Sequence, residues 1–273
     1  MSNDNQGRPK GTAKNLLDAA HKTGTVSKAA MTALDVADLG AQIQAGLGIA
    51  IDDIAASEVV LVTMMPDDSM SIAQAHNTQH VRDGHNLVLE SLRRSRQSGE
   101  VFVHTRYLNG EVLYPYVGLA DAIEMNDVNY DPRHGTPLYD QTIVLLGTVL
   151  AKSTELAQAG VPVRTVTLLI TDGGDYGSVR AGAKEVRALV TDLMAQENHV
   201  VAAMGISDGT TDFRGMSVGR ALSMARSHGL AVAIEGSGRC LAQDPPPGPS
   251  PTGAIHLTFV DPADRPAQPA AKP

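Results

Sequence analysis

The chain has 273 residues, of which 42% are hydrophobic and 19% charged, as in a folded globular protein with one sizeable domain and tails, or at most two small domains. Aromatic residues make up only 3%, tryptophan is absent and the net charge is −8. These values disfavour a nucleic-acid partner, because single strands are bound by stacking on aromatic rings and phosphate backbones are bound by positive charge.

The cysteine content and the lengths of the apolar runs predict the cellular compartment of the protein. The only cysteine is Cys240, so no disulfide can form within the chain, which favours a reducing environment. Residues 1–25 lack the apolar core of a signal peptide, and the longest apolar runs are too short to cross a bilayer. We therefore expect a cytoplasmic protein with no membrane partner, in which residues 1–25 form a flexible tail.

Helical and strand patterns follow one another along the chain. Apolar residues recur at helical spacing over 26–47, and we predict an N-terminal helical extension over 26–54. Beyond it, continuous apolar runs rich in β-branched residues predict buried strands, and amphipathic stretches between them predict helices. The expected strands are 57–64, 100–108, 111–119, 163–171, 199–206 and 229–235, and the expected helices are 72–97, 136–159, 178–197 and 214–228.

The alternation of strands and helices predicts an α/β fold with a doubly wound, Rossmann-like, mainly parallel sheet and helices on both faces. Asn109-Gly110 predicts a hairpin between two strands, because both turn positions need positive φ, so one edge strand is expected to be antiparallel. We assign this domain to residues 55–236. A Pro-rich C-terminal extension, 237–273, contains the alternating run 254–260, which predicts one further strand at an edge or docked on the domain.

A dense group of oxygen-bearing side chains follows the first strand of this domain. Asp67, Ser69 and Ser71 come just past its carboxyl end, and Asp172 comes just past a later strand. In open α/β sheets, ligands bind beyond the carboxyl ends of strands, where the strand order reverses. Thr136 lies on a loop that can reach the same end. If the two strands are neighbours, the five side chains converge, and such hard oxygen donors suit Mg²⁺ or Mn²⁺, with Ca²⁺ as a further candidate.

This set resembles a known family. Asp67-x-Ser69-x-Ser71, Thr136 within GTPL and Asp172 within ITDGG are similar to the metal-ion-dependent adhesion site (MIDAS) of von Willebrand factor A (vWA) domains. The resemblance covers the whole predicted α/β domain and includes its hairpin. It implies that the serines and the threonine touch the metal, that the aspartates often act through water, and that an Asp or Glu of a partner protein fills the open position. Neutral hydroxyl ligands withdraw little charge from the ion, so the ion remains electrophilic.

Two residues depart from the family pattern. Met70 stands between the serines, where the family usually has glycine, and a larger side chain would restrict a partner's approach or close the site. Asp68 is an additional acid that would perturb metal preference. A simpler interpretation of Asp67, Ser69 and Ser71 is a cluster that caps the next helix, but it leaves the other two pieces of the motif as coincidences.

Other polar residues are weaker candidates. His76 and His80 are four residues apart, a spacing that can hold zinc, and His85 lies beyond them, but no cysteine or third spaced ligand completes a site, which favours a solvated helix face. The stretch 207–215 lacks the lysine of a phosphate-binding loop, which argues against a nucleotide site. Several acids on loops are candidates for the rim of the metal site or its outer layer: Asp121, Glu124, Asp127, Asp131, Asp175 and Asp208.

The sequence thus predicts an adaptor-like protein-interaction module rather than an enzyme, because no catalytic constellation is visible. One alternative is a magnesium-dependent phosphohydrolase with Asp67 as its nucleophile, which would need a Lys or Arg against the substrate phosphate. Another is a metal-free structural scaffold, favoured if Met70 blocks the site.

Overall fold

The computed structural model describes residues 12–35, 39–205, 213–227, 230–244 and 254–260. The chain divides into two compact units, Met1–Ile206 and Ser207–Pro273. This division falls earlier than the domain end at 236 that the sequence predicted. The helix and strand expected over 214–235 therefore belong to the second unit and not to the main domain.

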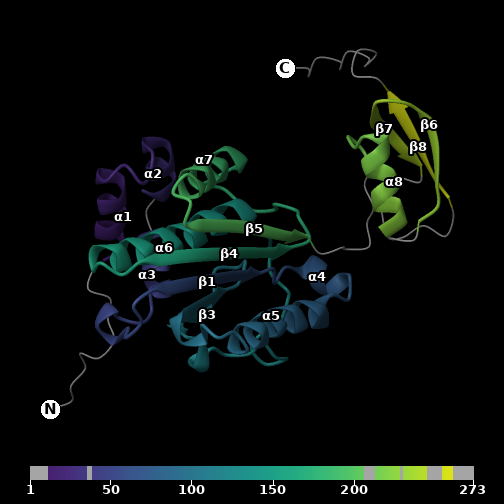
Figure 1. Ribbon diagram of the computed structural model, residues 1–273. Coiled ribbons are helices and arrows are strands. Elements are labelled where there is room, and N and C mark those ends of the chain that lie inside the picture. The colour runs from purple at the N-terminus through teal and green to yellow at the C-terminus, as the bar shows by residue number, and fades with distance from the viewer. Residues whose placement is uncertain (1–11, 36–38, 206–212, 228–229, 245–253, 261–273) are drawn as a thin grey trace. The chain divides into compact units, whose positions relative to one another are not determined.

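The first unit is built on a five-stranded sheet of order β3-β2-β1-β4-β5 (Figure 1). Its strands are β1 (Val59–Pro66), β2 (Val101–Arg106), β3 (Val112–Gly118), β4 (Val163–Thr171) and β5 (His199–Gly205). All neighbours pair in parallel except β3, which pairs antiparallel with β2 at one edge. This confirms the predicted mainly parallel sheet with one antiparallel edge strand. The strand order reverses between β1 and β4, which lie side by side.

Helices cover both faces of this sheet, and alternate residues of β1 show why. Successive side chains of a strand point to opposite faces. Met64 packs in one apolar cluster with Leu89 of α5, whereas Met65 packs in another with Leu145 of α6. The helices and 3₁₀ turns around the sheet are α4 (Met70–Gln74), α5 (Thr78–Arg93), α6 (Leu138–Gln158), α7 (Ala183–Met194), η1 (Ile51–Asp53), η2 (Ser98–Glu100) and η3 (Leu119–Asp121).

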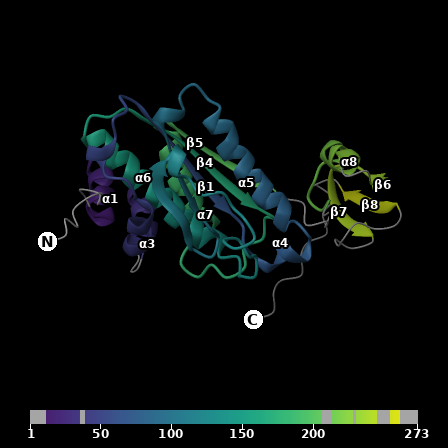
Figure 2. The same ribbon diagram turned by 90° about the horizontal axis from the view of Figure 1, so that it is seen from below.

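The N-terminal helices form a further layer against α6 and α7 (Figures 1 and 2). These helices are α1 (Ala13–Lys22), α2 (Lys28–Leu34) and α3 (Leu39–Gly46). Leu17 of α1 and Ile43 of α3 are buried in one apolar cluster with α6. A Cβ at Gly147 of α6 would lie 2.7 Å from Ile43 Cδ1, so glycine permits the close approach of α3. The prediction of a flexible tail over 1–25 is therefore wrong for α1, whose apolar residues are covered, and residues 1–11 lie outside the described part of the chain.

The second unit contains α8 (Val218–Ser227) and a three-stranded sheet of order β6-β8-β7. Its strands are β6 (Val232–Gly236), β7 (Arg239–Asp244) and β8 (Ile255–Val260). The predicted strand within 254–260 is confirmed as β8, but it is the central strand of this sheet and not an edge or docking strand, and β7 was not predicted at all. The alternating residues Ile255, Leu257 and Phe259 are buried in one cluster with residues of α8. Among the helices of the described residues, none has the length and apolar character needed to cross a bilayer.

Truncating a core residue of α1 tests whether this helix is part of the fold. Leu17 is 4% exposed, whereas Leu87 on α5 is 61% exposed. We expect Leu17→Ala to lower the free energy of unfolding by about 2 to 5 kcal/mol, because it removes buried methyl groups and leaves a cavity. Leu87→Ala is the matched control and should change it by less than about 0.5 kcal/mol. Urea denaturation measures both, and equal small effects would mean that α1 is not docked.

Candidate functional site

The carboxylate of Asp67 joins the carboxyl ends of β1 and β4. The Asp67 N–H donates to the carbonyl oxygen of Ile170 at 2.8 Å, which extends the pairing of the two strands. The side chain is fully buried, and its Oδ2 accepts a hydrogen bond from the Thr171 hydroxyl at 2.7 Å. Its Oδ1 accepts from the Ser69 N–H at 2.8 Å. Asp67 is therefore held next to the strand end from which Asp172 follows.

The two serines lie side by side where α4 begins. Ser69 occupies the capping position of α4, but its side chain makes no capping hydrogen bond. Its Oγ lies instead 2.8 Å from Oγ of Ser71, and the two hydroxyls are hydrogen-bonded. Ser69 is buried and Ser71 is partly exposed. The interpretation of Ser69 as a helix cap is therefore not supported, and the paired hydroxyls are available for another role.

The segment that carries Thr136 lies between the other two loops. The Met70 N–H donates to the carbonyl oxygen of His134 at 3.0 Å, and the His134 N–H donates to that of Asp68 at 3.1 Å. Two residues further on, Thr136 and Tyr176 exchange two backbone hydrogen bonds, of 3.1 and 2.7 Å. One short segment thus bridges the loop after β1 and the loop after β4.

All five predicted residues therefore lie at one end of the sheet, on three loops that backbone hydrogen bonds connect. The neighbouring positions of β1 and β4, on which the prediction depended, are confirmed. No group of three or more His, Cys, Asp or Glu side chains that could hold a metal is found in the described part of the chain. The predicted set has only two such residues, Asp67 and Asp172, and its other members are hydroxyls. The donor chemistry fits a hard divalent cation, because every side-chain donor is an oxygen.

Two residues that the sequence did not single out hold Asp67 in place. Thr171 donates to its carboxylate, and the Tyr130 hydroxyl donates to its main-chain carbonyl. Tyr130 is buried, and its own carbonyl accepts a hydrogen bond from Arg82 of α5 at 3.3 Å. Thr171 directly precedes Asp172 in the ITDGG stretch, so the sequence could have placed Thr171 near the site. Nothing local marks Tyr130.

The histidines considered for zinc do not gather into a site. His85 is fully buried, and its Nε2 lies 3.1 Å from both the Thr105 and Tyr114 hydroxyls. Burial lowers the pKa of His85. His80 has Nδ1 3.3 Å from the side-chain oxygen of Asn77. The prediction of a solvated face is therefore wrong for His85, which is a hydrogen-bonded core residue.

The acidic loop residues separate into different roles. Asp175 accepts hydrogen bonds from the Tyr139 N–H at 3.2 Å and the Ser178 hydroxyl at 2.6 Å, so it holds the start of α6. Glu124 forms an ion pair with Arg93 of α5 at 2.6 Å. Asp121 lies in η3, Asp131 lines the cavity described next, and Asp208 lies outside the described residues.

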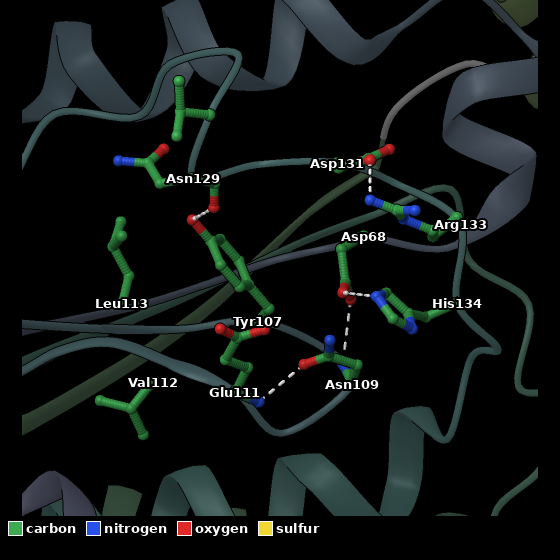
Figure 3. A pocket seen from close by; sticks show the side chains of 11 residues that line it. Asp68, Tyr107, Asn109, Glu111, Val112, Leu113, Asn129, Asp131, Arg133 and His134 are labelled. Carbon is green, nitrogen blue, oxygen red and sulfur yellow. Dashed lines mark hydrogen bonds and ion pairs between the residues drawn. The ribbon is translucent and has the colours of Figure 1, made fainter.

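A cavity of about 280 Å³ adjoins the site on the side of Asp68 (Figure 3). Asp68 is 2% exposed, its Oδ1 accepts from the Asn109 N–H at 2.9 Å, and its Oδ2 lies 3.9 Å from His134 Nε2. Burial raises the pKa of Asp68 to about 6. At the rim, Asp131 forms an ion pair with Arg133. The cavity lining consists of Asp68, Tyr107, Asn109, Glu111, Val112, Leu113, Val128, Asn129, Asp131, Arg133 and His134.

Comparison with profiles of known protein families found no match, and comparison with curated proteins found no similar sequence. The resemblance to vWA domains therefore rests on the motif residues of this chain. The geometry adds the pairing of β1 with β4 and the contacts among the three loops.

The raised pKa of Asp68 has a measurable consequence for stability. The folded state retains a proton at a pH where the unfolded chain has lost it, so this carboxyl destabilises the fold as the pH rises from about 4 to about 6. We expect Asp68→Asn to gain stability over the wild type across this interval, by up to about 3 kcal/mol at pH 7. Urea denaturation in EDTA from pH 4 to pH 7.5 measures the difference. Two parallel stability curves would contradict the assignment.

Proposed function

We propose that this chain is a cytoplasmic interaction module of the vWA type. It binds one Mg²⁺ or Mn²⁺ at the carboxyl ends of β1 and β4, and through that ion it binds an Asp or Glu of a partner protein. The observation that carries the proposal is the buried Asp67 carboxylate, which bridges the Ser69 N–H and the Thr171 hydroxyl at the point where the strand order reverses. Ligand sites of open α/β sheets occur at this point.

The residues present divide naturally into ligands and supports. The hydroxyls of Ser69, Ser71 and Thr136 would contact the ion. The Asp172 carboxylate would orient waters around it, and the Asp67 carboxylate would add negative charge beside it while holding the Ser69 backbone. The bound ion would supply a positive charge that neutral hydroxyls leave largely uncompensated. Ser71 and Asp172 are partly exposed, so a partner's carboxylate can approach from that side.

The arrangement of the sheet also supports the proposal. The resemblance implies an antiparallel hairpin strand within a mainly parallel sheet, and β3 is such a strand. It further requires the strand before Asp67 and the strand before Asp172 to be neighbours, as β1 and β4 are.

The phosphohydrolase alternative receives no support from Asp67. A nucleophilic carboxylate must present an oxygen to the substrate phosphorus. Asp67 is fully buried, and both its carboxylate oxygens accept hydrogen bonds from the protein. This carboxylate is placed to support the site rather than to attack a substrate.

Metal binding is the direct test. We expect calorimetry to detect one Mn²⁺ site in the wild type, and Ser69→Ala or Asp172→Ala to weaken it at least about tenfold, because each removes an oxygen donor or a water-orienting charge. Ser91→Ala is the matched control, since Ser91 is an exposed serine on α5 whose hydroxyl donates to the Leu87 carbonyl oxygen within its own helix. It should bind Mn²⁺ like the wild type.

Thermal unfolding gives a second readout. Mg²⁺ should raise the melting temperature of the wild type and of Ser91→Ala but not that of Asp172→Ala, because a ligand stabilises only the state that binds it. Equal Mn²⁺ affinity in the wild type and Asp172→Ala would show that the ion binds elsewhere. No binding by the wild type would leave the metal-free scaffold as the better description.

A further inference from the structure

Three exposed large apolar side chains lie close in the chain to the candidate metal site, Met70 at the start of α4, and Tyr176 and Val179 on the loop after β4. Met70 is 52% exposed, Tyr176 is 83% exposed and Val179 is 86% exposed. We call these three residues the apolar rim. Single exposed apolar residues are common and need no explanation, but a group of them on one surface marks an interaction site. Backbone contacts connect these three residues to one segment of the chain.

The backbone places Tyr176 beside Thr136. The two residues face each other in an antiparallel bridge and exchange both of their backbone hydrogen bonds. In such a pair the Cα atoms lie about 5.5 Å apart, and the two side chains leave the backbone on the same side. The side chain of Tyr176 therefore leaves the backbone on the same side as that of Thr136, which is one of the proposed metal ligands.

Met70 and Val179 are tied to the same stretch of chain. Met70 stands between Ser69 and Ser71 in the sequence, and its N–H donates to the carbonyl oxygen of His134, two residues before Thr136. The Val179 N–H donates to Oδ2 of Asp140 at 3.0 Å, four residues after Thr136. All three rim residues thus attach, within a few residues, to the segment that carries Thr136.

The backbone beneath the rim is held in place. Besides Val179, Asp140 accepts from the N–H groups of Arg180, at 3.0 Å, and Ala181, at 2.7 Å. Asp140 lies in the first turn of α6, which is a core helix. The exposed side chains therefore stand on an ordered support, which lowers the entropic cost of using them in an interface.

We propose that the partner segment that supplies the metal's carboxylate also places large apolar side chains on Met70, Tyr176 and Val179. This inference rests on the proposed function and specifies the chemistry of the partner. The recognised segment carries an Asp or Glu with Leu, Ile, Met or Phe within a few positions of it. Met70, which replaces the family's usual glycine, is then a contact residue rather than an obstruction, because its flexible thioether adapts to an apolar neighbour.

A peptide-display experiment tests both the proposed function and this inference. Random peptides with one fixed Asp or Glu are selected on the immobilised full chain in Mg²⁺ and eluted with EDTA. We expect large apolar residues to be enriched near the acid. EDTA-sensitive binders that show no apolar preference near the acid would overturn this inference and leave the proposed function intact. Absence of any EDTA-sensitive binder would overturn the proposed function, and this inference with it.

Variants then assign the contact to the rim. For a synthetic peptide from the selection, Tyr176→Ser with Val179→Ser should weaken binding at least about fivefold, as truncation of interface residues commonly does. Mn²⁺ affinity should stay unchanged, which distinguishes loss of the rim from loss of the metal site. Leu87→Ser is the control for removal of an exposed apolar side chain elsewhere and should bind the peptide normally. Unchanged peptide affinity in the double variant would overturn the inference.

Discussion

The buried Asp67 carboxylate is the interaction on which the site and the centre of the sheet both depend. A buried carboxylate is tolerated only when donors satisfy it, and here the donors come from the turn after β1 and from the end of β4. The same two hydrogen bonds set the backbone at Ser69 and fix the strand end that precedes Asp172. The group that would support a cation therefore also aligns the two strands between which the cation would lie.

The N-terminal helices support this arrangement from behind. Every residue of α6 from 142 to 153 is buried, because the sheet covers one side of the helix and the N-terminal layer covers another. Lys152, near the end of this stretch, is also buried, and it donates to Glu155 at 2.8 Å and to the main-chain carbonyl of Ile49. At the start of α6, just after Thr136, the Tyr139 N–H donates to the Asp175 carboxylate. The extension is thus part of the scaffold that positions Thr136.

Local patterns predicted those elements whose burial can be inferred from residues adjacent in the sequence. β1 and β4 read as continuous apolar runs, and the Asn109-Gly110 turn identified β3. Which sheet a strand joins depends on distant partners, so β6 was assigned to the wrong one. The motif placed the five oxygen donors at one end, but the bond from Thr171 to Asp67 spans 104 positions and the one from Tyr130 spans 63. No local pattern encodes such contacts.

The three loops at this end of the sheet share a property that bears on binding. Each is fastened to the next by backbone hydrogen bonds, at His134 on one side and at Thr136 on the other. Their conformational entropy is lost on folding, so a partner need not order them when it binds. The exposed residues Tyr176 and Val179 therefore stand on a fixed backbone, which the backbone of Thr136 and the carboxylate of Asp140 hold in place. An exposed apolar group on a fixed backbone costs solubility without adding stability, and the proposed contact with a partner segment would cover it.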